Sequence, residues 1–163
     1  MMISLIWAMT DERVIGINNS MPWKLPADMK WFRQHTLGKP IIMGRKTFDS
    51  FGAKPLPQRL NIIVTHDRQF QAQDAVVVGS IPEALAQVED AEEVMVIGGA
   101  SLYAQTLPLA QRLYMTLVHA NVKGDAWFPE FDLSQWSEIE RLEQAPDDKN
   151  PYACTFLILE RRA

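Results

Sequence analysis

Ile41-Ile42-Met43-Gly44-Arg45-Lys46-Thr47 is a short apolar run that passes through one glycine into polar residues. Its three apolar residues are typical of a strand covered on both faces of a sheet. The pattern recurs at Val94-Met95-Val96-Ile97-Gly98-Gly99-Ala100-Ser101. A glycine after a buried strand lets a ligand approach the backbone, and the following helix start offers free N–H groups to phosphate. A single such glycine more often marks a tight turn, but the two together favour a dinucleotide site.

Further strands and helices are expected around these two strands. The sequence predicts strands at about residues 3–8, 41–43, 60–65, 75–78, 94–97, 112–121, 137–142 and 152–160, and helices from Pro26, over 48–51, from a capped start at Ser80 to about Glu89, and over 102–107. Residues 10–21 are expected to be a mobile loop. This order predicts an α/β fold, with a central, mostly parallel eight-stranded sheet, an antiparallel C-terminal edge strand and about four helices flanking both faces.

Composition and charge exclude several classes of protein. The chain has 163 residues, 47% apolar and 22% charged, with a net charge of −4, which indicates one domain over residues 1–163. Its basic residues form no cluster, which argues against nucleic acid as a partner. The single Cys154 rules out an internal disulfide, and three scattered histidines predict no metal site. Residues 1–9 are too short for a membrane span and lack a basic leader, so we expect a cytoplasmic protein with no membrane partner.

Asp28 is the single acid of an aromatic and apolar segment, Met21-Pro22-Trp23-Lys24-Leu25-Pro26-Ala27-Asp28-Met29-Lys30-Trp31-Phe32. Pro26 suits the first turn of a helix, and helical spacing places Met29 and Phe32 on the same face as Asp28. An acid in a first turn is commonly a partner of the helix dipole, so the pattern also fits a purely structural carboxylate. A water-poor pocket, in contrast, raises the pKa of such a carboxyl toward neutrality.

Four side chains that can carry positive charge follow two predicted strands. Arg45 and Lys46 follow residues 41–43, and His66 and Arg68 follow the next predicted strand. If the two strands are neighbours, these groups converge at one edge of the sheet and suit the 2′-phosphate of NADPH. If the strands are apart, the same groups are ordinary solvated surface charge.

Several ordered blocks resemble the bacterial dihydrofolate reductases over essentially the whole chain. They are Val14-Ile15-Gly16, Met21-Pro22-Trp23-x-Leu25-Pro26-Ala27-Asp28, Gly38-Lys39-Pro40-Ile41-Ile42-Met43-Gly44-Arg45-x-Thr47, Pro55-Leu56-Pro57-x-Arg59-x-Asn61, Ile97-Gly98-Gly99, Leu113-Tyr114-x-Thr116 and Gly124-Asp125. The resemblance implies reduction of 7,8-dihydrofolate to 5,6,7,8-tetrahydrofolate for one-carbon metabolism, with hydride transfer from NADPH to C6 and protonation at N5. It also implies an adenosine-binding subdomain at about residues 39–90, a monomer, and inhibition by antifolates such as trimethoprim or methotrexate.

The resemblance assigns catalytic roles to Asp28, Thr116, Trp23 and Met21. Asp28 is expected to hold the pterin through N3 and the 2-amino group and to promote protonation at N5, and Thr116 to support that contact. Trp23 is expected to bind a water near the pterin, while Met21 belongs to a loop that closes over the nicotinamide. The substrate-binding residues it implies are Ile6, Ala8, Asp28, Met29, Phe32, Phe51, Leu56, Arg59, Ile97 and Thr116. Arg59 is expected to pair with the glutamate α-carboxylate, a bidentate task that lysine performs poorly.

The same resemblance implies a larger set of NADPH contacts. They are Ala8, Ile15, Gly16, Asn19, Met21, Gly44, Arg45, Lys46, Thr47, Thr65, His66, Ile97, Gly98, Gly99, Ala100, Ser101, Leu102 and Tyr103. His66 is expected beside the 2′-phosphate, and Asp125 is expected to brace the closed loop.

Two other functions remain open at this point. One is a reductase of the same fold that acts on another pterin or on a ribosyl-aminopyrimidine. The other is a non-catalytic module that binds a nucleotide or folate. Asp28 and Arg59 together favour folate, because they match the pterin edge and the tail carboxylate of that substrate.

Overall fold

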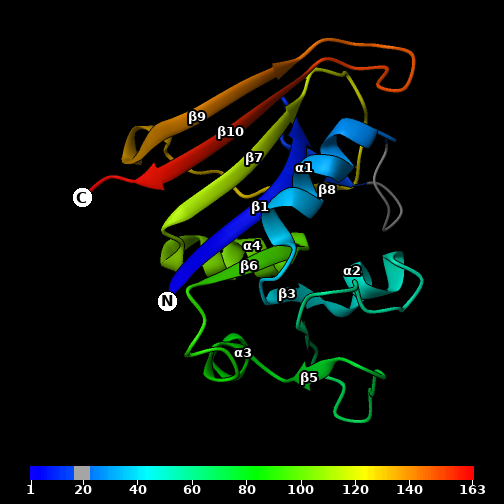
Figure 1. The fold of residues 1–163 in the computed structure, drawn as a ribbon, viewed down its shortest axis with the longest axis vertical. Helices are drawn as coiled ribbons and strands as arrows, with labels where there is room; N and C mark the ends of the chain where they lie inside the picture. The colour runs from blue at the N-terminus through cyan, green and yellow to red at the C-terminus, as the bar shows by residue number, and fades with distance from the viewer. Residues whose placement is uncertain (17–22) are drawn as a thin grey trace.

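An eight-stranded sheet forms the centre of the computed structural model, which describes residues 1–16 and 23–163 (Figure 1). Its strands are β1 (Met2–Thr10), β3 (Ile41–Gly44), β4 (Asn61–Val64), β5 (Val76–Val78), β6 (Glu93–Gly98), β7 (Arg112–Val118), β9 (Trp136–Gln144) and β10 (Cys154–Arg161). They lie in the order β5-β4-β3-β6-β1-β7-β10-β9. The pairs from β5 through β7 are parallel, and the C-terminal β10 runs antiparallel to both β7 and β9. The predicted mostly parallel sheet is confirmed, and β9 rather than the C-terminal strand forms the edge.

A second, two-stranded sheet joins β2 (Val14–Gly16) to β8 (Ala126–Trp127). The expectation of a loop throughout residues 10–21 is therefore wrong at residues 14–16; residues 17–21 lie outside the described part of the chain. Three residues carry too little pattern to reveal a strand that depends on a distant partner. The backbone of Asp125 extends this pairing, because its N–H donates to the carbonyl of Gly16 at 2.9 Å.

Four α-helices flank the sheet within the described residues, as predicted. They are α1 (Pro26–Thr36), α2 (Arg45–Ser50), α3 (Ile81–Ala86) and α4 (Ala100–Thr106), with short 3₁₀ turns η1 (Leu107–Leu109) and η2 (Leu133–Gln135). The cap predicted for α3 is confirmed, since Ser80 Oγ accepts from the N–H of Glu83 at 3.2 Å. The helix ends at Ala86 and not near Glu89, because tight turn bonds follow it, including Val88 N–H to the carbonyl of Leu85 at 3.1 Å. None of the described helices is long and apolar enough to cross a membrane.

Alternate residues of β1 divide the core into two layers. Leu5 and Trp7 pack with residues of α3 and α4 on one face of the sheet. Ile6 and Ala8 pack with residues of α1 and α2 on the other face. This alternation follows from the pleat of a strand buried on both sides. The starts of α1, α2 and α4 lie near the carboxyl ends of the parallel strands, which is where sheets of this kind bind ligands.

Candidate active site

Asp28 and Thr116 form the polar centre of the site. Asp28 is the third residue of α1, and Thr116 is a fully buried residue of β7. The hydroxyl of Thr116 donates to Asp28 Oδ1 at 2.8 Å. Burial raises the pKa of Asp28 to about 6, and the Thr116 hydrogen bond opposes part of this rise because it stabilises the charged form. A carboxyl with this pKa exchanges its proton close to neutral pH.

Apolar side chains gather around this acid. Ile6, Ala8, Trp23 and Ile97 belong to one buried cluster, and Phe32 and Leu56 are partly buried against it. Met29 and Phe51 are 70% and 38% exposed, so they present apolar surface that a bound molecule can cover. The structure thus brings most of the predicted pocket wall into one cluster.

The indole of Trp23 carries a hydrogen-bond donor that has no partner in the described part of the chain. The residue is only 7% exposed, and its Nε1 finds no acceptor among the described residues. Buried donors of this kind are normally satisfied by protein, water or ligand. This observation supports the predicted water contact of Trp23.

Arg59 is oriented but has no acidic partner in the described part of the chain. Its Nη1 donates to Thr36 Oγ1 and its Nε donates to the carbonyl of Pro57, both at 2.9 Å. Partial burial and the nearby charge of Arg33 hold the pKa of Arg59 below its usual value. An oriented guanidinium next to a second cation is suited to receive a carboxylate from outside.

The glycine turns that follow β3 and β6 lie side by side, because these strands are neighbours. Gly98 has φ +127°, and a Cβ at this position would meet the Tyr103 hydroxyl at 3.2 Å, so only glycine fits. The Gly98–Gly99 peptide bond is cis. A Cβ added to Gly99 would lie 3.7 Å from Thr47 Oγ1, which places Thr47 at the turn, and one added to Gly44 would lie 3.9 Å from the carbonyl oxygen of Gly98. The two helix starts predicted for a dinucleotide are therefore brought together.

A cleft of about 840 Å³ opens at the carboxyl ends of β4 and β5, and Thr65, His66 and Arg68 line it. The strands β3 and β4 are paired, as the predicted convergence of cations requires. Asp67 lines the cleft and contacts Arg45. The Arg45 Nη1 donates a hydrogen bond to Asp67 Oδ2 at 3.0 Å. Lys46 is exposed on α2 and does not line this cleft.

The remaining predicted cofactor residues fall into three groups. Leu102 and Tyr103 are buried in α4, and the Tyr103 hydroxyl donates to the carbonyl of Ile6 at 2.8 Å, so it is already engaged inside the protein. Burial and the charge of Asp28 raise the pKa of Tyr103 well above its usual value. Ala100 begins α4, and Ser101 is exposed beside it. Ile15 and Gly16 lie in β2, whereas Asn19 and Met21 lie outside the described residues.

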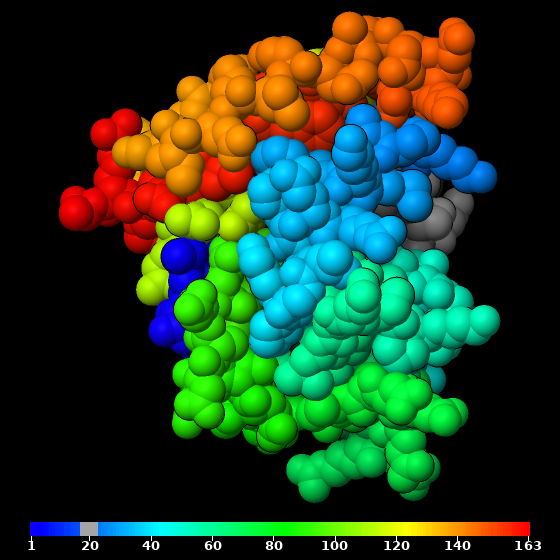
Figure 2. Space-filling model, in the orientation of Figure 1, coloured from blue at the N-terminus to red at the C-terminus, as the bar shows by residue number. Residues whose placement is uncertain are grey.

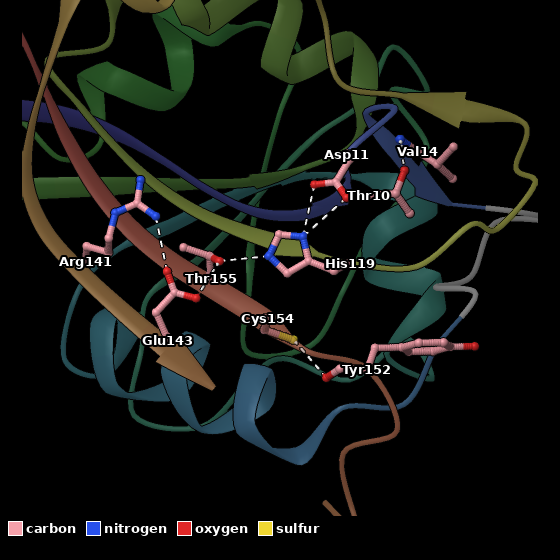
Figure 3. Close-up of polar contacts among 9 residues, drawn as sticks. All are labelled: Thr10, Asp11, Val14, His119, Arg141, Glu143, Tyr152, Cys154 and Thr155. Carbon is pink, nitrogen blue, oxygen red and sulfur yellow. Dashed lines mark hydrogen bonds and ion pairs between the residues drawn. The ribbon is translucent and has the colours of Figure 1, made fainter. Parts of the chain in front are cut away.

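Sequence reasoning missed a chain of polar contacts at the end of β7 (Figure 3). His119 Nδ1 lies 3.1 Å from Asp11 Oδ1, and its Nε2 lies 2.8 Å from Thr155 Oγ1. Thr155 in turn donates to Glu143 at 3.3 Å. Asp11 begins the turn between β1 and β2, so the chain ties that turn to β9 and β10. No local pattern reveals it, because its members come from four distant segments.

Asn150 was also missed, although it touches the helix that carries Asp28. Its side-chain oxygen accepts from the N–H of Ala27 at 2.9 Å. The two residues are 123 positions apart, and a lone asparagine in a polar loop gives no signal of such a contact.

Comparison with known proteins identifies the family. A sequence-family model described as dihydrofolate reductase matches residues 2–161. The chain is 48% identical to the dihydrofolate reductase type 3 of Salmonella typhimurium over 162 residues, 99% of each chain. It is 47% identical to the dihydrofolate reductase of Bacillus subtilis over 161 residues, 99% of this chain and 95% of the relative.

A solved structure agrees with these relatives. The dihydrofolate reductase from Enterococcus faecalis complexed with NADP(H) and RAB-propyl matches with a TM-score of 0.93 and 36% identity. The match covers 99% of this chain and 97% of that chain. The resemblance read from the sequence blocks is thereby confirmed: the protein belongs to the dihydrofolate reductase family.

Proposed function

We propose that Asp28 is the acid with which this dihydrofolate reductase binds the pterin of 7,8-dihydrofolate and promotes its protonation at N5. The family reaction is the NADPH-dependent reduction of 7,8-dihydrofolate to 5,6,7,8-tetrahydrofolate, and bound NADPH supplies the hydride that reaches C6. The observation that carries the proposal is the Asp28–Thr116 pair, a single titratable acid fixed in an apolar pocket.

The Asp28–Thr116 pair serves both substrate binding and proton exchange, and each task uses a different charge state of Asp28. When ionised, Asp28 accepts hydrogen bonds from N3 and the 2-amino group of the pterin, while Thr116 holds the carboxylate in one orientation. Because the pKa of Asp28 is about 6, a proton can be held in the pocket near neutral pH. The Trp23 N–H offers a contact for water beside the pterin. The surrounding apolar side chains exclude other water, which helps to align the reacting rings.

Residues 39–90 are proposed to bind the adenosine half of NADPH. The glycine turn after β3 and the cleft lined by Thr65, His66 and Arg68 both belong to this segment. The turn at Gly98 supplies the second backbone approach, and only glycine fits there because an added Cβ would meet the Tyr103 hydroxyl at 3.2 Å. Arg59 is proposed to bind the glutamate α-carboxylate of the substrate, since its guanidinium is oriented and pairs with no acid of the described chain.

The proposal also covers antifolate binding, the oligomeric state of the protein and its location in the cell. Trimethoprim and methotrexate present paired N–H donors that suit the Asp28 carboxylate, so we propose that both bind here. We also propose that the protein acts as a cytoplasmic monomer.

A spectrophotometric assay tests the proposal. Dihydrofolate should cause loss of NADPH absorbance, and Asp28→Asn should lower the hydride-transfer rate about 10²–10⁴-fold at pH 7 and less at pH 5, where solvent protons are abundant. Glu92→Gln, at an exposed acid outside the proposed substrate and cofactor sites, is the control. A near-normal rate in Asp28→Asn at every pH would remove Asp28 from the mechanism, and NADPH binding without turnover would indicate a binding module.

A further inference from the structure

Helix α1 begins without a cap of its own. Leu25 occupies the N-cap position and forms no side-chain cap hydrogen bond. Pro26 follows it and has no N–H, so Ala27 carries the first backbone donor of the helix. The N–H of the second helical residue is normally satisfied by the side chain at the N-cap, which leucine cannot provide.

Asn150 supplies the missing acceptor from the connection between β9 and β10. Its Oδ1 accepts from Ala27 N–H at 2.9 Å, and the residue is only 6% exposed. Its Nδ2 and its backbone N–H both donate to Asp147 Oδ1, at 3.0 and 2.7 Å, which fixes the amide with its oxygen toward α1. In Figure 2 the orange surface of this connection lies beside the blue surface of the segment that begins α1.

This outside cap has a consequence for Asp28. An acidic side chain at the third position of a helix commonly turns back to the N-terminal backbone of its own helix. Here the carboxylate of Asp28 is turned to Thr116 instead. Because Asn150 satisfies the helix start, the acid is left available to the pocket.

We propose that Asn150 is a positioning residue for the reaction, which holds the first turn of α1 so that Asp28 stays buried against Thr116. The inference rests on the proposed role of Asp28. It predicts that loss of the Asn150 acceptor loosens this turn, hydrates the carboxyl and makes Asp28 more acidic.

The test is a ¹³C NMR titration of the Asp28 carboxyl in Asn150→Ala, together with the pH profile of hydride transfer; the Asp28→Asn spectrum assigns the signal. The titration midpoint should fall by about half to one pH unit. A fall of one pH unit in this midpoint lowers the protonated fraction of Asp28 at pH 7 about tenfold. Hydride transfer should therefore fall about three- to tenfold at pH 7 and less than about twofold at pH 5.

Two further variants separate positioning from general stability. The double variant Asp147→Asn with Asn150→Asp exchanges the two side chains. It keeps an acceptor for the Ala27 N–H, the contact between positions 147 and 150, and the net charge. The titration midpoint of Asp28 should therefore not fall in this variant. Asp132→Ala removes a comparable cap, in which Asp132 accepts from Ser134 N–H at 2.9 Å at the start of η2. Asp132→Ala and Asn150→Ala should each lower Tm by about 2–4 °C, but Asp132→Ala should not move the Asp28 titration midpoint.

An unchanged midpoint in Asn150→Ala, with hydride transfer reduced by one factor at every pH, would overturn the proposal. If Asn150→Ala does not fold, Asn150→Ser, whose shorter side chain does not reach Ala27, gives the same test. If Asp28 is not the acid, Asp28→Asn leaves the kinetic profile unchanged while the NMR midpoint still reports the effect of Asn150. The two failures are therefore distinguishable.

Discussion

At the scale of single residues, the protein accepts a cost in stability to keep Asp28 titratable. Burial disfavours the carboxylate, and one hydrogen bond from Thr116 only partly offsets this cost. The stability of the rest of the fold therefore keeps the Asp28 carboxyl buried, because its own burial is unfavourable. Such sites are typical of function and not of stability.

This cost gives a prediction about pH and stability. The pKa of Asp28 is about 6 in the folded protein and about 3.8 in the unfolded chain, so the folded state binds the proton more tightly. Stability due to this group is present below about pH 4 and is lost as pH rises to about 6. Asp28→Asn should therefore raise the free energy of unfolding by about 2–3 kcal/mol at pH 7 and by much less at pH 4. Urea unfolding at both pH values is the measurement, and equal differences at the two would contradict it.

At the scale of elements, the register of neighbouring strands assembles the charged edge of the site. The parallel pairing of β3 with β4 brings Arg45 close to the cleft that His66 and Arg68 line. The guanidinium carbon Cζ of Arg45 lies 4.2 Å from the centre of the Phe70 ring, and Arg45 also forms an ion pair with Asp67. These two contacts limit the motion of the Arg45 side chain. A phosphate at this edge meets cations from two different strand ends.

Cofactor choice tests that edge. NADPH should be preferred over NADH, because its 2′-phosphate should lie against the side chains of Arg45, His66 and Arg68 at this edge. His66→Gln should reduce the preference, while the KM for NADH, which lacks the 2′-phosphate, stays the same. Equal KM values for the two cofactors in the unaltered enzyme would refute the assignment.

The polar chain at the end of β7 gives a second prediction at this scale. Thr155 is only 3% exposed, and its hydroxyl bridges His119 and Glu143 (Figure 3). Thr155→Val preserves shape but leaves these partners without the hydroxyl, so it should lower the free energy of unfolding by about 1–2 kcal/mol. Thr155→Ser, which keeps the hydroxyl, is the control. Chemical denaturation that gave the same loss for both would assign the effect to packing.

At the scale of the whole molecule, one continuous sheet connects all parts of the site. The proposed substrate side is built on β1, β7 and α1, and the proposed cofactor side on β3, β4 and β6. Because β6 lies between β3 and β1, the two halves share the centre of the sheet. Ligands that bridge them should stabilise the molecule as a unit.

Thermal unfolding measures that coupling. NADPH at about 100 times its Kd should stabilise the folded state by about 2.7 kcal/mol, which corresponds to a rise in Tm of about 5–10 °C. Adenosine 2′,5′-bisphosphate, which contains the 2′-phosphate but no nicotinamide, should also raise Tm if residues 39–90 bind the adenosine half. No shift with this fragment, despite a shift with NADPH, would place the main binding energy elsewhere.

The elements and their local chemistry follow from short stretches of sequence. Short apolar runs and, near the C-terminus, alternating stretches indicate the eight strands of the main sheet, the capping pattern at Ser80 indicates α3, and Pro26 places Asp28 in a first turn. These features depend on neighbours within a few residues, where periodicity and backbone preferences act directly. The family also follows from sequence alone, because its ordered blocks are spread along the whole chain.

Which distant groups meet depends on tertiary packing. Packing sets the order of the strands, the pairing of β2 with β8, and the contact of Thr116 with Asp28 across 88 positions. It also brings Asn150 to the start of α1. The pKa of Asp28 belongs to this level as well, because burial is produced jointly by segments that are far apart in the chain. Local sequence specifies what each element is, whereas packing specifies what surrounds it, and the chemistry of this site depends on the surroundings.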